Sequence, residues 1–429
     1  MSAELSQGPG TPGGGPLSAA EIDAAAKRIA GVVTPTPLQF SDRLSATTGA
    51  SVYLKREDLQ VVRSYKLRGA YNLLVQLSDD ELAAGVVCSS AGNHAQGFAF
   101  ACRTLGVHGR VYVPAKTPKQ KRDRIRYHGG EFIELIVGGS TYDLAAAAAL
   151  ADVARTGATL VPPYDDLRTI AGQGTIAVEL LDQLDGEPDL VVVPVGGGGC
   201  IAGITTYLAE RTNNTAVLGV EPAGAAAMMA ALAAGEPVTL DHVDQFVDGA
   251  AVRRAGTLTY AALAAAGDMV SITTVDEGAV CTAMLDLYQN EGIIAEPAGA
   301  LAVAGLLEAD VEPDTTVVCL VSGGNNDVSR YGEVLERSLV HLGLKHYFLV
   351  DFPQEPGALR RFLDDVLGPN DDITLFEYVK RNNRETGPAL VGIELGSAAG
   401  LEPLLARMKA SPMRIEQLSP GTPAYGYLT

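Results

Sequence analysis

Four short segments of this sequence hold residues whose types and spacing could support catalysis. In the first, SYKLRGA at residues 64–70, a lysine stands at the start of a predicted helix. The positive end of a helix dipole disfavours a cation and lowers the pKa of an amine, which makes the amine a better nucleophile. Lys66 is therefore a candidate for forming an imine, although its spacing alone favours an ordinary solvated lysine.

The second segment, SSAGNHAQG at residues 89–97, joins an apolar run to a predicted helix. Serine, glycine and asparagine at a helix start leave backbone N–H groups facing an anion. A substrate carboxylate would fit there. The alternative is ordinary N-capping by Asn93, with His94 in solvent.

The third segment, PVGGGGCIAG at residues 194–203, follows a predicted strand and opens a predicted helix. Its four glycines let the backbone wrap closely around a phosphate. A dinucleotide site is the alternative, because Gly197, Gly199 and Ala202 match G-x-G-x-x-G/A and Glu221 follows about twenty residues later. Against it, this loop comes after five predicted strands, whereas that fingerprint usually occupies the first strand–helix turn of its domain.

The fourth segment, VSGGNN at residues 321–326, places the hydroxyl of Ser322 directly after another apolar run. A hydroxyl at the carboxyl end of a strand can face the same crevice as the other loops. The alternative is a simple turn, which glycine and asparagine favour.

Short apolar runs alternate with helical patterns between about residues 50 and 324. Several runs are almost wholly apolar, which is typical of parallel strands covered on both faces. This predicts an α/β wound fold with the four segments at neighbouring loops. The predicted strands are 52–55, 85–88, 110–113, 132–137, 190–195, 217–220 and 315–321. The predicted helices are 66–77, 94–105, 119–127, 142–155, 174–184, 201–211 and 277–290.

After about residue 342 the pattern changes to βαββαβ, which predicts a ferredoxin-like fold. We expect a disordered tail at 1–16, rich in glycine and proline, a first domain at 17–335 and a second at 345–429. The predicted elements of the second domain are the strands 346–351, 373–381, 389–395 and 413–418 and the helices 358–367 and 401–409.

The composition excludes several classes of protein. The formal net charge of −19 argues against nucleic-acid binding, which needs clustered positive charge. The five cysteines stand in apolar or glycine-rich runs without a CxxC pair, which indicates reduced thiols and a cytoplasmic protein. No run of about 18 apolar residues predicts a membrane span.

In their order, these segments resemble the fold-type II enzymes that use pyridoxal 5′-phosphate (PLP). The sequence is most similar to the biosynthetic threonine ammonia-lyases (threonine dehydratases). SYKLRGA, SAGNHAQG, VPVGGGG and VSGGN carry the resemblance, and AGQGT at 171–175 and AEPAGA at 295–300 add to it. The resemblance implies elimination of water and ammonia from L-threonine to give 2-oxobutanoate, the first step of isoleucine biosynthesis.

The resemblance also implies a role for each matching residue. Lys66 would carry PLP as a Schiff base and, once freed, remove the Cα proton of the substrate. Asn93 would contact the 3′-oxygen of PLP, and Ser322 its pyridine nitrogen. Ser90, Asn93 and His94 would meet the substrate carboxylate. The full set implied to bind PLP is Lys66, Tyr65, Asn93, Gly196, Gly197, Gly198, Gly199, Cys200 and Ser322.

Two positions depart from related enzymes. Serine racemases of this fold carry a serine where this chain has Ala91, so we expect little racemase activity; a serine dehydratase or racemase is the alternative activity. The same relatives place metal-binding oxygens after a Glu-Pro turn. Here Glu221-Pro222 is followed by alanines and a glycine, so no metal site is expected.

The C-terminal domain resembles the ACT-like regulatory domain of these enzymes, in one copy where longer relatives have two. The resemblance implies inhibition by isoleucine, opposition by valine, an effector near the turn at 351–357, and a homotetramer. Residues 17–335 would then be the PLP-binding catalytic domain. A dimerisation module without a ligand is the alternative for the C-terminal domain.

Overall fold

The computed structural model describes residues 17–378, 380, 384–419 and 425, so the predicted tail at 1–16 lies outside the described residues. The chain divides into two compact units. The first contains Met1–Glu277 and Asp286–Asp327, and the second contains Gly278–Leu285 and Val328–Thr429. The units are therefore not continuous in sequence, because one stretch of a helix groups with the C-terminal part.

A six-stranded sheet forms the centre of the first unit, in the order β1-β2-β10-β7-β8-β9. Every neighbouring pair is parallel except β1 with β2. The inner strands β7 and β10 are mostly valine and leucine because both of their faces are buried. The strands are β1 (Leu38–Phe40), β2 (Ser51–Arg56), β7 (Leu190–Pro194), β8 (Ala216–Pro222), β9 (Val270–Val275) and β10 (Thr316–Val321).

A second sheet of the first unit has four parallel strands in the order β5-β4-β3-β6. Its core is a separate apolar cluster that includes Phe98, Val111 and Ile125. The first unit therefore has two wound sheets with two cores. The strands are β3 (Val86–Ser89), β4 (Gly109–Val113), β5 (Ile133–Val137) and β6 (Thr159–Leu160).

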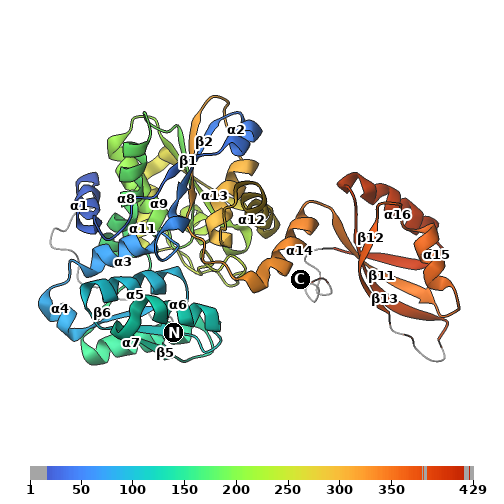
Figure 1. The fold of residues 1–429 in the computed structure, drawn as a ribbon, viewed down its shortest axis with the longest axis horizontal. Helices are drawn as coiled ribbons and strands as arrows, with labels where there is room; N and C mark the ends of the chain where they lie inside the picture. Colours follow the sequence, from blue (N-terminus) through green and yellow to red (C-terminus); the bar gives the residue numbers. More distant parts are fainter. Residues whose placement is uncertain (1–16, 379, 381–383, 420–424, 426–429) are drawn as a thin grey trace. The chain divides into compact units, whose positions relative to one another are not determined.

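Helices cover both sheets. On the six-stranded sheet, α9 packs against β7 and α13 packs against β7, β8 and β10, and Figure 1 shows these two helices on different sides of the strands. The helices are α1 (Ala19–Ile29), α2 (Asp42–Thr48), α3 (Lys66–Leu74), α4 (Asp79–Ala84), α5 (Asn93–Leu105), α6 (Lys119–Gly129), α7 (Tyr142–Thr156), α8 (Leu167–Gln183), α9 (Gly199–Arg211), α10 (Ala227–Ala234), α11 (Thr257–Ala266), α12 (Glu277–Glu291) and α13 (Pro297–Glu308).

The predicted α/β fold is confirmed, and all seven predicted strands and seven predicted helices of this part are present. Helix α8 begins seven residues earlier than predicted, at Leu167, because the side chain of Asp166 accepts the backbone N–H of Arg168 and caps it. Helix α13 was not predicted. It is buried on all sides and so has no polar stripe to mark its period.

The second unit forms one antiparallel sheet in the order β12-β13-β11-β14. Its βαββαβ order confirms the predicted ferredoxin-like fold. The phenylalanines Phe348, Phe352 and Phe362 lie in its core. The elements are β11 (Lys345–Pro353), α15 (Ala358–Asp365), β12 (Asp372–Tyr378), β13 (Thr386–Glu394), α16 (Leu401–Ala410) and β14 (Arg414–Leu418), preceded by α14 (Tyr331–His341).

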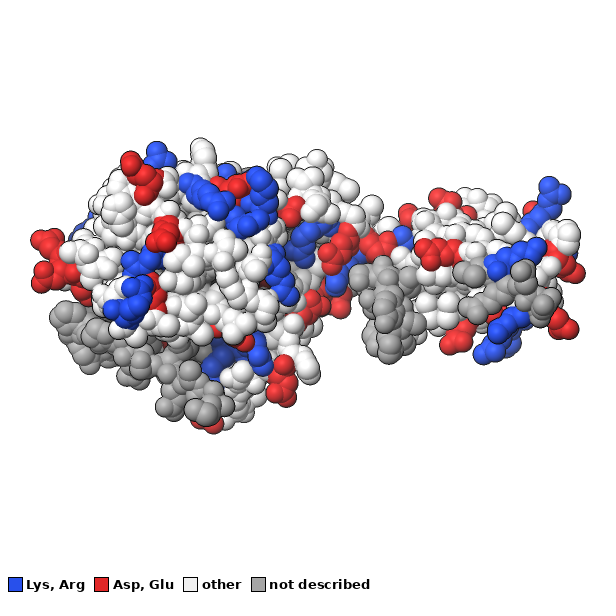
Figure 2. All heavy atoms as spheres, turned by 90° about the horizontal axis from the view of Figure 1, so that it is seen from below, with Lys and Arg blue, Asp and Glu red and all other residues white. Residues whose placement is uncertain are grey.

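Charged side chains of both signs lie interspersed over the face of the first unit that Figure 2 shows. In the described part of the chain, no helix is long and apolar enough to cross a membrane. All five cysteines are buried. Short 3₁₀ helices complete the fold: η1 (Glu57–Leu59), η2 (Gly130–Phe132), η3 (Ala223–Ala225), η4 (Gly267–Met269), η5 (Val328–Arg330) and η6 (Ala398–Gly400).

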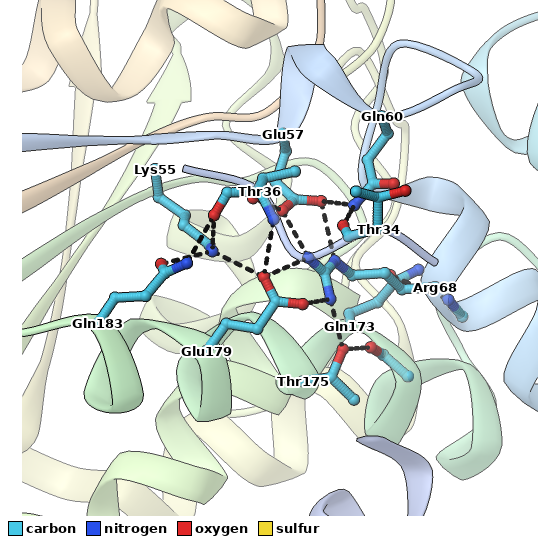
Figure 3. A network of polar contacts seen from close by, with 12 residues as sticks. Thr34, Thr36, Lys55, Glu57, Gln60, Arg68, Gln173, Thr175, Glu179 and Gln183 are labelled. Carbon is cyan, nitrogen blue, oxygen red and sulfur yellow. Dashed lines mark hydrogen bonds and ion pairs between the residues drawn. The ribbon is translucent and has the colours of Figure 1, made fainter. Parts of the chain in front are cut away.

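A buried network of charged side chains, centred on Arg68, fixes helix α3 (Figure 3). The guanidinium of Arg68 donates to both carboxylate oxygens of Glu57, at 2.9 and 2.7 Å, and to both of Glu179, at 2.6 and 2.9 Å. The amine of Lys55 also donates to Glu179, at 2.7 Å. Burial alone would raise the pKa of Glu57, but the charge and hydrogen bonds of Arg68 outweigh it and lower that pKa. Two cations and two carboxylates thus compensate one another, and they tie α3 to β2 and α8.

Candidate active site

Lys66 is the first residue of α3. The chain before it is fixed to the end of β10, because Ser64 pairs with Gly323 and the backbone N–H of Tyr65 donates to the carbonyl of Ser322 at 3.2 Å. The Lys66 amine donates to the carbonyl of Pro163 at 3.2 Å and lies 5.1 Å from the centre of the Tyr65 ring. The first turn of α3 contains no acidic residue and its N-cap makes no side-chain hydrogen bond.

Burial lowers the pKa of Lys66 from 10.5 to about 8, and the more distant acidic groups of Cys200 and Glu296 offset it only in part. No carboxylate pairs with this amine among the salt bridges of the described residues. Roughly a tenth of Lys66 is therefore neutral at pH 7, far more than for an ordinary lysine, and a neutral amine can attack a carbonyl or accept a proton.

Close packing of helices holds the backbone at Lys66. A Cβ added to Gly172 of α8 would lie 2.6 Å from the carbonyl oxygen of Arg68. A Cβ added to Gly97 of α5 would lie 2.9 Å from the backbone nitrogen of Leu67. Neither distance leaves room for a side chain, so these two glycines let α8 and α5 touch the first turn of α3 directly.

The amine of Lys66 faces a pocket of about 240 Å³, a volume that includes its open mouth. The glycine loop between β7 and α9 forms one wall of this pocket. The lining residues are Tyr65, Lys66, Tyr164, Pro194, Gly196, Gly197, Gly198, Gly199, Cys200 and Gly249. The predicted lysine, aromatic ring and glycine loop are therefore brought together at one cavity.

The glycine loop is shaped to hold an anion. Gly198 has a φ of +89°, and a Cβ added to Gly197 would lie 2.3 Å from the ring of Tyr164. The carbonyl of Gly197 accepts from the hydroxyl of Thr259 at 2.7 Å and from the backbone N–H of Gly256 at 3.2 Å. Helix α9 begins at Gly199, directly after this loop. Its first N–H groups lack partners within the helix, and this end of the helix dipole is positive. A phosphate group fits these donors.

The second predicted segment lies at the start of α5. Asn93 is the first residue of this helix, and its side chain contacts Glu296 and Asn325. The hydroxyl of Ser90 accepts the N–H of Gly92 at 3.3 Å. Asn93 and Ser90 are both partly buried, so both stay accessible from one side.

The imidazole of His94 points away from solvent, with Nε2 bonded to the carbonyl of Val161 at 2.8 Å. Because a carbonyl only accepts, Nε2 carries the hydrogen. Burial and the nearby Lys66 charge lower the pKa of His94 to about 4, so the ring is neutral at neutral pH. The neutral ring has no free donor for a substrate carboxylate, so only the backbone N–H of His94 can bind one.

The hydroxyl of Ser322 is buried at the end of β10 and donates to the carbonyl of Ala298 at 3.1 Å. It thus lies next to the segment that leads into Lys66, but it is not among the described residues that line the pocket. The hydroxyl proton can rotate, so Ser322 is able to donate to or accept from another group.

The alternative of a dinucleotide site is not supported by the position of Glu221. Its carboxylate is fully buried and accepts the N–H groups of Met228 and Met229 at 2.7 and 2.8 Å, which caps α10. A buried cap cannot reach a ribose hydroxyl. Within the described residues, no group of three or more His, Cys, Asp or Glu side chains is arranged to hold a metal ion.

Sequence reasoning did not single out Tyr164, Gly249 or Glu296. Tyr164 packs against Gly197 and Gly199, and Gly249 lines the pocket from a loop far along the chain. Neither residue belongs to a motif, so no local signal could have found them. Glu296 lies inside AEPAGA, and this motif could have pointed to it as a site residue.

Comparison with known proteins agrees with this geometry. Residues 29–323 match the family described as pyridoxal-phosphate dependent enzyme, and residues 336–428 match the C-terminal regulatory domain of threonine dehydratase. The chain is 89% identical over 428 residues to the L-threonine dehydratase biosynthetic IlvA of Mycobacterium tuberculosis, with 100% of both chains covered.

Solved structures of enzymes with two different activities are also similar to this chain. The processed form of threonine deaminase isoform 2 from Solanum lycopersicum is 36% identical with a TM-score of 0.70, covering 76% of this chain and 96% of that one. A maize serine racemase is 30% identical with a TM-score of 0.69, covering 76% and 99%. The chain therefore belongs to the pyridoxal-phosphate dependent enzymes and, among them, to the biosynthetic L-threonine dehydratase family.

Proposed function

We propose that this protein converts L-threonine to 2-oxobutanoate and ammonia with PLP bound at Lys66. The observation that supports this best is the Lys66 amine, whose pKa is lowered to about 8 and which faces the glycine-lined pocket. An amine of lowered pKa is suited to carry a carbonyl cofactor and to accept a proton.

Each residue that the motifs single out has a task in this proposal. The loop Gly196, Gly197, Gly198 and Gly199, together with Cys200, binds the phosphate through backbone N–H groups at the start of α9. Asn93 would donate to the 3′-oxygen of bound PLP, Ser322 would contact its pyridine nitrogen, and Tyr65 would lie beside its ring. The hydroxyl of Ser90 and the N–H groups at the start of α5, including those of Asn93 and His94, bind the substrate carboxylate.

When bound, PLP supplies an electron sink for the charge left on Cα. The Nζ atom of Lys66 takes the Cα proton, because the lowered pKa leaves it neutral in part and able to act as a base. Tyr65 and Tyr164 narrow the pocket around this amine and limit the entry of water. Ala91 offers no proton on the other face, which favours elimination over racemisation.

The test is the rate of 2-oxobutanoate formation from L-threonine. Lys66→Ala should lower kcat by at least about 100-fold, the effect of losing a general base. Lys27→Ala, at an exposed lysine of α1, is the matched control and should keep the wild-type rate. If Lys66→Ala retained activity, the proposed role of this lysine would be wrong.

Two further measurements, ketoacid formation from L-serine and the appearance of D-amino acids, test the alternative of a serine dehydratase or racemase. We expect threonine to be used with a higher kcat/KM than serine, and D-serine or D-threonine to stay below detection because of Ala91. Accumulation of a D-amino acid would instead favour the racemase alternative.

We further propose that the second unit binds isoleucine as an inhibitor, with valine opposing it, in a cytoplasmic homotetramer. The regulatory family match at residues 336–428 and the ferredoxin-like fold support an effector-binding role. Addition of isoleucine to the full chain should raise the KM for threonine, and valine should reverse the effect. Sedimentation should give four copies per particle. Kinetics that do not respond to isoleucine would favour a purely structural unit.

A further inference from the structure

Both ends of the Asn93 side-chain amide are engaged by other segments of the chain. The Nδ2 atom donates to Oε1 of Glu296, which stands at the N-cap of α13. The Oδ1 atom accepts from Nδ2 of Asn325 at 2.8 Å. Three of the recognised motifs, at α5, at α13 and after β10, therefore meet at this one amide.

These contacts determine which end of the amide is which. When Glu296 is ionised its carboxylate can only accept, and the amide nitrogen of Asn325 can only donate. A flipped Asn93 would place its oxygen against Glu296 and its nitrogen against the Asn325 nitrogen, which loses both hydrogen bonds. Asn325 cannot rotate to compensate, because its Nδ2 also donates to the carbonyl of Val62 at 2.8 Å. Neither contact uses the second amide hydrogen of Asn93.

Glu296 is placed for this task rather than for capping. Its side chain is 5% exposed, and although it occupies an N-cap position it makes no side-chain cap hydrogen bond. It lies directly behind the pocket, since a Cβ added to Gly249 would be 3.8 Å from its Oε1. Burial raises the pKa of Glu296 to about 7, with a contribution from Asp248, while Asn93 and Lys121 act in the opposite direction.

We infer that Glu296 and Asn325 are positioning residues that hold the Asn93 amide with an N–H, and not its oxygen, facing the 3′-oxygen of PLP. This inference rests on the proposed function, which assigns Asn93 to that oxygen. The 3′-oxygen carries negative charge in the bound cofactor, so a flipped amide would replace an attraction with a repulsion. The pair acts on the 3′-oxygen through Asn93, and the charge of Glu296 separately raises the pKa of Lys66, against the lowering by burial.

Asn325→Asp gives the sharpest test, because aspartate has the same shape but can only accept. It removes the donor to Oδ1 of Asn93 and favours the flipped amide. The dissociation constant of PLP and the visible absorbance band of the holoenzyme are measured at pH 8.5, where Glu296 is ionised. We expect PLP affinity to fall by about ten-fold or more and the band to shift. Asn214→Asp, at an exposed position, is the control for added charge and should change neither.

A double-mutant cycle separates positioning from general disturbance. In an Asn93→Ala background, Asn325→Asp should change the PLP dissociation constant by less than about two-fold. An effect as large as in the wild-type background would overturn the inference, and so would an unshifted band and unchanged affinity in the single variant. If Asn325→Asp did not fold, Asn325→Ala, which removes the same donor to Oδ1 of Asn93, would be measured in the same cycle with the same criteria.

The two proposals fail in different ways. If the wild type did not form 2-oxobutanoate, the proposed function would be lost whatever the spectra showed. If the wild type were active and bound PLP but both variants matched it in affinity and absorbance, only the positioning role would be refuted.

Discussion

Lys55 and Lys66 are both withdrawn from water, yet their surroundings differ. The Lys55 amine donates to the carbonyl of Thr36, to Glu179 and to Gln183, at 2.7, 2.7 and 2.9 Å. Among the described residues, the Lys66 amine has one hydrogen-bond acceptor, the carbonyl of Pro163 at 3.2 Å. Burial lowers the pKa of both, but at Lys55 a bonded carboxylate opposes it. Lys55, which is paired with a carboxylate, therefore stabilises the fold. Lys66, which is buried without a bonded carboxylate, lies where we expect the chemistry to take place.

The largest predicted effect is a loss of stability on substitution of Arg68, which belongs to the buried charge network that also contains Lys55. Arg68→Ala would leave Glu57 and Glu179 buried next to each other with only Lys55 nearby. We expect the first unit to lose about 3–5 kcal/mol of its free energy of unfolding, measured by urea denaturation followed by circular dichroism. Arg211→Ala is the matched control, because Arg211 pairs with Asp23 at the surface and should cost less than about 1 kcal/mol. If both variants lost the same free energy of unfolding, the buried network would be no more important for stability than a surface ion pair.

The two lysines should respond to substitution with opposite signs. In cofactor-free protein at pH 7, Lys55→Met should destabilise by about 3 kcal/mol, because Glu179 loses a partner. Lys66→Met should stabilise by about 1–3 kcal/mol, because an unpaired ammonium no longer has to be buried.

The pH dependence checks the sign for Lys66. Its pKa is about 8 in the folded state against an ordinary value of 10.5, so the folded protein binds fewer protons between these values. Stability of the wild type should therefore rise with pH from about 8 to 10.5, and Lys66→Met should lack this rise. Unfolding curves at pH 7 and pH 10 measure it, and parallel behaviour of the two proteins would contradict a lowered pKa.

The smallest expected effect on stability comes from backbone strain at Arg63, close to Lys66. Among the described non-glycine residues only Arg63, with φ of 56°, and Asp314, with φ of 62°, have a positive φ, and Arg63 lies three residues before Lys66. Arg63→Gly should stabilise by about 0.5–1 kcal/mol because glycine adopts this conformation freely. Asp314→Gly should change less, since aspartate tolerates it better. A thermal unfolding midpoint that falls in Arg63→Gly would show that the Arg63 side chain matters more than its strain.

Much of the fold could be predicted because its signals are local. The runs that became β7 and β10 are apolar because both of their faces are covered, and the glycines before α9 mark a strand–helix turn. Two missed elements lack such signals: β6 has two residues, and α13 is apolar all round. Others had a signal that was overlooked, because α1 and α4 each begin with a capping box, at Ser18 and at Ser78. The predicted start of α8 was late because the cap, Asp166, lies outside the periodic pattern.

The sequence by itself determined the kinds of residues at the four loops and the class of cofactor that they suit, because each motif is a short run at a strand end. Only the tertiary structure decided what surrounds Lys66: the ring of Tyr164, the carbonyl of Pro163 and the absence of a bonded carboxylate. It also decided the orientation of Asn93, through partners 203 and 232 residues away. Contacts at such separation depend on how helices and sheets pack, and no local pattern in the chain encodes them.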